Sequence, residues 1–360
     1  MAVYYLATTE HLYLSLELGW IHKNINDRES VLREKHIGDS VIVLIGSGKK
    51  DTRVLLKFPP KSVWVYLYSD ETVNFRQNLN VLKSNAVIGV LRPYSIKTKK
   101  FELKKMCESV FCALNELYLS RSKSLLLWNC LSLFLGFYFY AKNTLLLILH
   151  EYLRVINLDT YLGYTNLFGE CLTNFRDAGK KESLIHQSLL DLRKPEERIL
   201  EFQFVGQRGK LWRKYALAES EKLLESRIYM VVNKAFGGTK GANFASEDSA
   251  RLFFSSARKA RFSICPAGNY SGTTFRWMET LMSGSLPIQS FRVSPDFLTS
   301  KALYANKTCD WKSWRTLILD AGRISETERV QLIKECLQKV QRHNDSLNRY
   351  LAEHLMLRGK

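Results

Sequence analysis

The chain has 360 residues, of which 46% are hydrophobic, so it is long enough for two domains that each bury a core. Its formal net charge of +18 calls for an anionic partner, such as a membrane surface, an acidic glycan or nucleic acid. Its seven cysteines are scattered and form no Cys-x-x-Cys pair, which argues against a disulfide framework or a metal site and favours thiols in a reducing compartment.

The first 20 residues, MAVYYLATTEHLYLSLELGW, predict a strand followed by a helix. This segment has no basic start and carries Glu10 and Glu17, so it does not resemble a signal peptide. We therefore expect a cytoplasmic protein, with a peripheral contact at the cytoplasmic face of a membrane as an open alternative.

Short apolar runs alternate with helical patterns along the rest of the chain. The predicted strands are Val3 to Ala7, Ser40 to Ile45, Val63 to Tyr68, Val87 to Leu91, Phe202 to Val205, Ile228 to Val232, Phe262 to Cys265, Leu286 to Gln289 and Thr316 to Leu319. The predicted helices include Leu211 to Leu224, Ser246 to Ala257 and Glu326 to Val340, with a further amphipathic segment from Asp345 to Leu357. This alternation indicates the α/β class.

An uncharged run of 18 residues, Ser124 to Ala141 (SLLLWNCLSLFLGFYFYA), is followed closely by the apolar Thr144 to His150. Three interpretations stay open. The run is a helical hairpin packed on a domain core, an insertion into one face of a membrane, or a membrane-spanning helix.

Basic residues precede this apolar run and include Lys97, Lys99, Lys100, Lys104 and Lys105. Their position beside an apolar segment favours a membrane surface over nucleic acid. No zinc-finger spacing, aromatic RNA-binding string or helix-turn-helix pattern occurs, so we expect no nucleic-acid partner. The charged, irregular segment from 170 to 200 is interpreted as an interdomain linker.

The residues from Phe262 to Ile288, FSICPAGNYSGTTFRWMETLMSGSLPI, combine a buried strand, a Gly-rich turn and a short helix. Arg276 and Glu279 are three apart on that helix and are predicted to share its polar face, while Gly284 ends it. The free N–H groups of a helix start and the Arg276 guanidinium suit a diphosphate, and Glu279 suits ribose hydroxyls. The alternative is an ordinary surface ion pair between Arg276 and Glu279.

This string resembles the C-terminal signature of exostosin-like glycosyltransferases, through Cys265, Pro266, Gly268, Thr274, Arg276, Glu279, Gly284, Pro287 and Ile288. Other segments resemble further landmarks of the same family: FQFVGQRG with Arg208, VWVYLYSDE with Asp70 and Glu71, LRPY with Arg92 and Tyr94, LGYTNLF with Tyr164, and WKSWRTLILD as a strand before the closing helices. Ala267 departs from the family pattern, as does the exit strand, which runs into Gln289, Ser290, Phe291 and Arg292. These departures leave the identity of the sugar open.

The resemblance implies a GT-B fold, in which two Rossmann-like domains face a cleft. Residues 1–185 would form the acceptor-side domain, with a mainly helical apolar insertion at about 105–155. Residues 186–340 would form the nucleotide-sugar domain, and residues 341–360 a helix that crosses back.

The resemblance also implies an inverting hexosyl- or pentosyltransferase that builds a surface polysaccharide, a lipopolysaccharide or a glycoprotein glycan. Donor binding would fall to Arg208, Gly268, Ser271, Gly272, Thr273, Thr274, Arg276 and Glu279. Arg92, Tyr94 and Tyr164 would be landmarks of the acceptor side. No cofactor or metal is expected, since arginines and N–H groups can stabilise the departing phosphate and the chain has no Asp-x-Asp string.

Asp70 and Glu71 are the candidates for the base that deprotonates the acceptor hydroxyl, because they follow a predicted strand of the other domain. The alternative is that Asp70 caps a helix and Glu71 lies in its first turn. At the level of the whole chain, the alternative function is a non-catalytic, basic membrane-surface or nucleic-acid-associated protein that kept the fold.

Deleting residues 124–149 distinguishes a core segment from a membrane segment. If the run packs on a core, the deletion variant does not fold, because it loses a large apolar surface. If the run docks on a membrane, the variant stays folded but no longer floats with liposomes of anionic lipid. Circular dichroism and liposome flotation measure the two outcomes, with the intact chain as the control.

Overall fold

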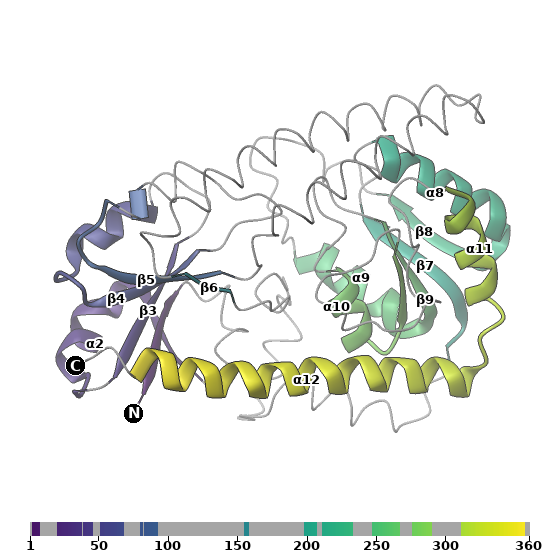
Figure 1. The fold of residues 1–360 in the computed structure, drawn as a ribbon. Helices are drawn as coiled ribbons and strands as arrows, with labels where there is room; N and C mark the ends of the chain where they lie inside the picture. The colour runs from purple at the N-terminus through teal and green to yellow at the C-terminus, as the bar shows by residue number, and fades with distance from the viewer. Residues whose placement is uncertain are drawn as a thin grey trace.

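The computed structural model describes residues 2–7, 20–37, 39–45, 51–67, 80–81, 83–92, 155–157, 198–206, 211–232, 247–266, 276–289 and 311–356. These residues form two separate sheets with helices packed against them (Figure 1). All of the strand pairs in both sheets are parallel. The α/β class expected from the alternating pattern is therefore confirmed, and the topology is compatible with a Rossmann-like fold.

The first sheet has six strands in the order β2-β1-β3-β4-β5-β6. Their bounds are Val3–Ala7 (β1), Ile21–Asn24 (β2), Ser40–Ile45 (β3), Val63–Leu67 (β4), Val87–Arg92 (β5) and Val155–Asn157 (β6). From β1 the chain moves to one side to form β2, and from β3 onward it moves to the other side. The strand order therefore reverses between the carboxyl ends of β1 and β3, which is a topological switch point.

The central strands of the first sheet are apolar because both of their faces are buried. Side chains alternate between the two faces, as the two-residue period of a strand requires. On one face Val43 and Val65 pack with Val31 of α2 (Arg28–Glu34), and on the other Trp64 and Tyr66 form an aromatic-rich cluster. Short 3-10 helices at Ile25–Asp27 and Asp51–Lys57 complete the described part of this unit.

The second sheet has four strands in the order β10-β9-β7-β8. Their bounds are Leu200–Gly206 (β7), Ile228–Val232 (β8), Ala260–Cys265 (β9) and Leu286–Gln289 (β10). Here the order reverses between β7 and β9, because the chain moves from β7 outward to β8 and from β9 to the opposite side for β10. Parallel strands in this order place a second switch point at the carboxyl ends of β7 and β9.

Helices cover both faces of the second sheet (Figure 1). They are α8 (Leu211–Leu224) and α11 (Trp311–Ala321) on one side, and α9 (Glu247–Lys259) and α10 (Arg276–Met282) on the other. A 3-10 turn at Glu225–Arg227 joins α8 to β8. The buried Trp314 fastens α11 to α8, since its indole Nε1 lies 3.3 Å from both the Ala216 carbonyl oxygen and Ser220 Oγ.

The predicted strand from Thr316 to Leu319 is wrong, because these residues lie in α11. The same correction applies to WKSWRTLILD as a strand before the closing helices. A four-residue apolar run fits a strand as well as a helix when it is considered alone. Over the longer segment, however, the buried residues are Trp314, Leu317, Ile318 and Ala321, which is helical spacing.

The last helix, α12 (Glu326–Met356), is continuous over 31 residues, so the expected break between Val340 and Asp345 does not occur. It begins at Ser325, whose Oγ accepts the Glu328 N–H at 3.2 Å, as an N-cap residue does. Figure 1 shows α12 running from beside the second sheet to the side of the first. The division into domains at residue 185 stays a prediction.

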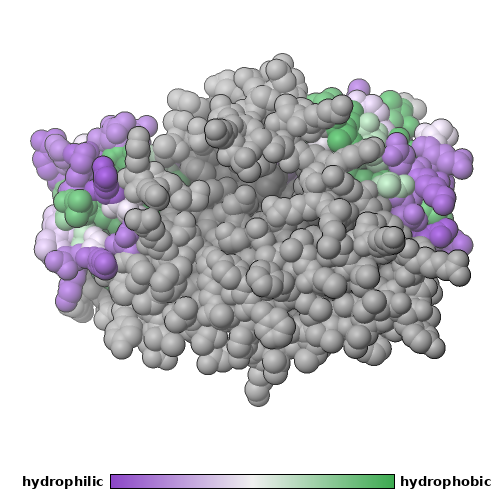
Figure 2. Space-filling view, turned by 90° about the horizontal axis from the view of Figure 1, so that it is seen from above, coloured by the Kyte–Doolittle hydropathy of each residue, from purple (hydrophilic) through white to green (hydrophobic). Residues whose placement is uncertain are grey.

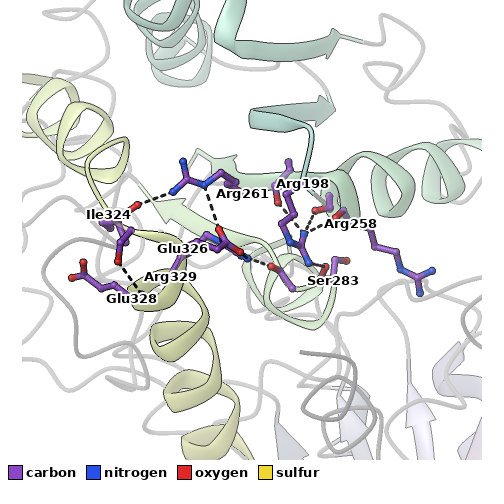
Figure 3. A network of polar contacts seen from close by, with 12 residues as sticks. Arg198, Arg258, Arg261, Ser283, Ile324, Glu326, Glu328 and Arg329 are labelled. Atoms are coloured by element: carbon purple, nitrogen blue, oxygen red, sulfur yellow. Dashed lines mark hydrogen bonds and ion pairs between the residues drawn. The ribbon is translucent and has the colours of Figure 1, made fainter. Parts of the chain in front are cut away.

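Arg261, Glu326 and Arg329 fasten the start of α12 to the amino-terminal edge of the second sheet, and Arg198 holds the ends of α9 and α10 nearby (Figure 3). We call this group the arginine clasp. Arg329 is only 1% exposed, binds both carboxylate oxygens of Glu326 at 2.9 and 2.5 Å, and donates to the Gly284 carbonyl at 2.6 Å. Arg261 Nε lies 3.4 Å from the same carboxylate, and Arg261 also donates to the Ile324 carbonyl.

Arg198 donates hydrogen bonds to carbonyls at the ends of two helices, α9 and α10. Its guanidinium donates to the carbonyls of Ala257, Arg258 and Ala260 at 3.1, 2.6 and 3.0 Å, and to that of Ser283 at 3.3 Å. The last carbonyls of a helix have no partner inside the helix and carry partial negative charge. The Arg198 guanidinium at the C-terminal ends of α9 and α10 therefore supplies hydrogen-bond donors to these carbonyls and a positive charge opposite their partial negative charge.

Replacing Arg329 tests the clasp. R329M keeps an apolar stem but leaves the buried Gly284 carbonyl without its donor, so we expect a loss of about 1–3 kcal/mol in the free energy of unfolding. Urea titration measures the loss. The control is R323A, because Arg323 is 80% exposed and its pair with Asp320 is worth about 1 kcal/mol or less. Equal losses in the two variants would contradict the assignment.

The clasp also predicts a pH dependence. Hydrogen bonding from Arg329 holds the pKa of Glu326 below its ordinary value of 4.5, against the opposing effect of burial, and the charges of Arg329, Arg261 and Arg198 act in the same direction as the hydrogen bond. Because the pKa of Glu326 is lower in the folded state than in the unfolded state, the ionised carboxylate stabilises the fold above pH 4.5. This contribution is lost as the pH falls through the folded-state pKa. The Tm gap between the wild type and E326Q should close over that range, whereas a gap independent of pH contradicts this.

Candidate functional site

The carboxyl edge of the second sheet is the candidate site, because two of the predicted donor-binding segments leave it from neighbouring strands. Strands β7 and β9 pair directly, with Phe202 beside Phe262 and Gln203 beside Ser263. The segment that carries Arg208 follows the end of β7 at Gly206, and the Gly-rich turn follows the end of β9 at Cys265. Ligands of open parallel sheets bind outside such a pair of strand ends.

The predicted donor-binding residues divide into those outside the described part of the chain and two that belong to α10. Arg208, Gly268, Ser271, Gly272, Thr273 and Thr274 lie outside the described residues. Arg276 is the first residue of α10, and its side chain is not described. The described helix covers seven residues, and the predicted start at Thr274 lies outside the described residues.

Glu279 is described, and it is buried, with 5% of its surface exposed. Its neighbours Thr280 and Leu281 are fully buried, so the described side chains from 279 to 281 face the interior, whereas the sequence predicted a polar face at Glu279. The alternative of an ion pair with Arg276 stays open, although the burial of Glu279 places its carboxylate away from the exposed surface. A buried ionisable group is costly unless it is partnered, which makes such groups informative about function.

A connected set of polar side chains lies between the sheet and α9. Gln203 Nε2 donates to Ser263 Oγ at 2.7 Å, and Ser256 Oγ of α9 donates to Gln203 Oε1 at 3.3 Å. Ser263 Oγ also lies 2.9 Å from Ser285 Oγ, just before β10. These hydrogen bonds satisfy the buried groups and connect β7, β9, α9 and the start of β10.

The polar contacts continue toward the carboxyl edge. Cys265 Sγ, at the end of β9, lies 3.6 Å from Thr280 Oγ1 in α10, and both residues are buried. The contact ties the strand to the helix that carries Glu279. Burial is expected for both groups, since a free cysteine behaves as a small apolar residue with a weak S–H donor.

The exit from α10 is a left-handed turn at Gly284, with φ of 73°. The Gly284 N–H donates to the Leu281 carbonyl at 2.9 Å and the Ser285 N–H to the Thr280 carbonyl at 3.1 Å. This pair of bonds is the Schellman arrangement, which favours glycine at that position. The prediction that Gly284 ends the helix is confirmed.

The predicted acceptor-side residues lie mostly outside the described residues. Asp70 and Glu71 follow β4, which is one strand away from the β1/β3 switch point, and both lie outside the described residues together with Tyr94 and Tyr164. Arg92 ends β5, where its backbone is in register with Asn157 of β6, but its side chain is not described.

Sequence reasoning missed the buried polar residues that support the site, above all Gln203, Ser263 and Thr280. A signal was present, because Gln203 and Ser263 interrupt apolar runs that are buried on both faces. In such strands a polar side chain requires a buried partner.

No group of His, Cys, Asp and Glu side chains among the described residues could hold a metal ion. None of the helices described has both the length and the apolar character needed to cross a membrane. Figure 2 shows that the described surface at both ends of the molecule is mostly hydrophilic, with smaller hydrophobic groups between.

Comparison with family models, with curated proteins and with solved structures finds no match for the chain. The fold itself defines the class of protein, an α/β protein built on two parallel sheets with a switch point in each. The resemblance to exostosin-like glycosyltransferases is carried by the quoted residues alone and stays a prediction.

Proposed function

We propose that this chain is a glycosyltransferase that moves a sugar from a nucleotide-diphosphate donor to a hydroxyl of a glycan or glycolipid acceptor. One observation carries the proposal. The two segments that resemble donor-binding motifs, FVGQRG and CPAGNYSGTTFRWME, follow neighbouring strands at the switch point of the second sheet. The strands that lead into these segments, β7 and β9, pair directly, so their carboxyl ends lie side by side at the edge where parallel sheets bind ligands.

The chemistry of these segments suits a nucleoside diphosphate. Arginine forms paired, charge-assisted hydrogen bonds with phosphate oxygens, which is the role proposed for Arg208 and Arg276. Backbone N–H groups and hydroxyls from Gly268 to Thr274 would add neutral donors to the departing diphosphate. Glu279 would accept hydrogen bonds from the ribose hydroxyls, and its burial makes such bonds stronger than they would be in water.

We further propose an arrangement of the two sheets and a course for the reaction. The two sheets would form a GT-B pair, with the first sheet on the acceptor side and Asp70 or Glu71 as the base that accepts the hydroxyl proton. Arg92, Tyr94 and Tyr164 would belong to that side. The reaction would invert the anomeric centre without a metal, in the cytoplasm, and residues 124–149 would provide any peripheral membrane contact.

The donor-binding role of α10 predicts the effect of two substitutions. R276A and E279Q should each weaken the binding of uridine or guanosine diphosphate about 10-fold or more, because each removes a charge-assisted hydrogen bond. Isothermal titration calorimetry measures the affinity. E279Q keeps the shape of a buried side chain, so its fold is expected to survive, and Tm checks this.

The matched control is R323A, which removes an exposed arginine from the turn between α11 and α12. It should leave the nucleotide affinity unchanged. Folded R276A and E279Q proteins with wild-type affinity for both diphosphates would show that the pocket is misplaced. A thermal-shift series with nucleotide sugars then identifies the donor, because a ligand that binds only the folded state raises Tm with concentration.

A further inference from the structure

The helix that carries Glu279 is too short to hold its own orientation. It has seven residues, fewer than two turns, and helices of that length are not stable without tertiary contacts. The groups that fasten α10 to the sheet therefore help to decide where Glu279 points, and the described residues show such groups at Thr280 and just after the C-terminal end of the helix.

The C-terminal end of α10 is held by contacts that form part of the fold. Arg198 donates to the Ser283 carbonyl and Arg329 to the Gly284 carbonyl, while Ser285 bonds Ser263 of β9. These contacts fix where the helix ends. Nearer to Glu279, a polar contact between the helix and β9 joins Thr280 to Cys265.

The contact between Thr280 and Cys265 has the position needed to orient Glu279. Thr280 follows Glu279 directly, so the two side chains leave the helix about 100° apart, and fixing one fixes the direction of the other. Thr280 Oγ1 lies 3.6 Å from Cys265 Sγ, and both residues are at most 1% exposed. Because Cys265 is the last residue of β9, the contact joins α10 to the end of this strand at the switch point.

We propose that Thr280 and Cys265 are positioning residues, which hold Glu279 in the orientation that binds the ribose of a nucleoside diphosphate. The inference rests on the proposed function, and it adds two residues that do not touch the ligand. Threonine suits the task because its hydroxyl reaches the sulfur while its methyl group fills apolar space. Valine preserves that shape and removes only the hydrogen bond.

The test compares T280V and T280S with the wild type, using uridine diphosphate and guanosine diphosphate as probes in calorimetry. T280V should weaken binding on the order of 3- to 10-fold, the equivalent of one hydrogen bond, whereas T280S, which keeps the hydroxyl, should stay within about 2-fold. C265A should behave like T280V. The C265A/T280V double variant should be no weaker than either single variant, because the two residues act through one contact.

The control is S220A, which removes another fully buried hydroxyl from the same domain, on the other face of the sheet. It should lower Tm and leave the affinity unchanged. An equal loss of affinity in S220A, a T280V affinity equal to wild type, or additive effects in the double variant would each overturn the inference.

Hydrogen exchange of residues 276–289 separates this inference from the proposed function. The amides of this segment should exchange faster in T280V than in S220A when each variant is measured at the same interval below its own Tm. The reason is that only T280V releases α10 from β9. If the wild type binds neither diphosphate, the proposed function fails and the ligand role of the pair fails with it. If the wild type binds and T280V shows neither faster exchange nor weaker binding, the positioning role alone is overturned.

Discussion

The ends of α9 and α10 depend on arginine side chains that complete their hydrogen bonding. In a strand-helix-strand unit the helix returns to the amino-terminal edge of the sheet, so its last carbonyls face that edge without partners. Arg198 donates to three carbonyls around the end of α9 and to Ser283 after α10, and Arg329 donates to Gly284. Because Arg329 also binds Glu326, the same contacts determine where α12 begins.

This arrangement separates the two edges of the second sheet. The amino-terminal edge is occupied by helix ends, the arginine clasp and the first turn of α12 (Figure 3). Its basic residues are engaged with backbone carbonyls and with Glu326, so their first role is structural. The carboxyl edge, where β7 and β9 end side by side, is left for ligand-binding segments.

The two faces of the second sheet also differ in their chemistry. On the side of α8 and α11 the contacts are mostly aromatic and aliphatic, as with the stacked rings of Phe202 and Phe262, and the buried Trp314 adds hydrogen bonds to Ala216 and Ser220. On the side of α9 and α10 they include hydrogen-bonded Gln203, Ser256 and Ser263, and the Cys265 contact with Thr280. Polar contacts are directional, whereas apolar packing allows small rotations. A helix that must present one side chain in a fixed direction is therefore better held by polar contacts.

The sequence by itself determined most of the described strands, because runs such as VIVLI and VWVYL must be buried on both faces, and it also determined the turn at Gly284. It did not determine Trp311–Ala321, where a short apolar run suits either a strand or a helix, nor β2, whose residues Ile21–Asn24 show no apolar alternation. Only the tertiary structure decided which strands are neighbours, and so which strand ends meet at a switch point. It alone showed that Glu279 is buried and that Thr280 meets Cys265, because contacts between residues distant in sequence depend on how the elements pack.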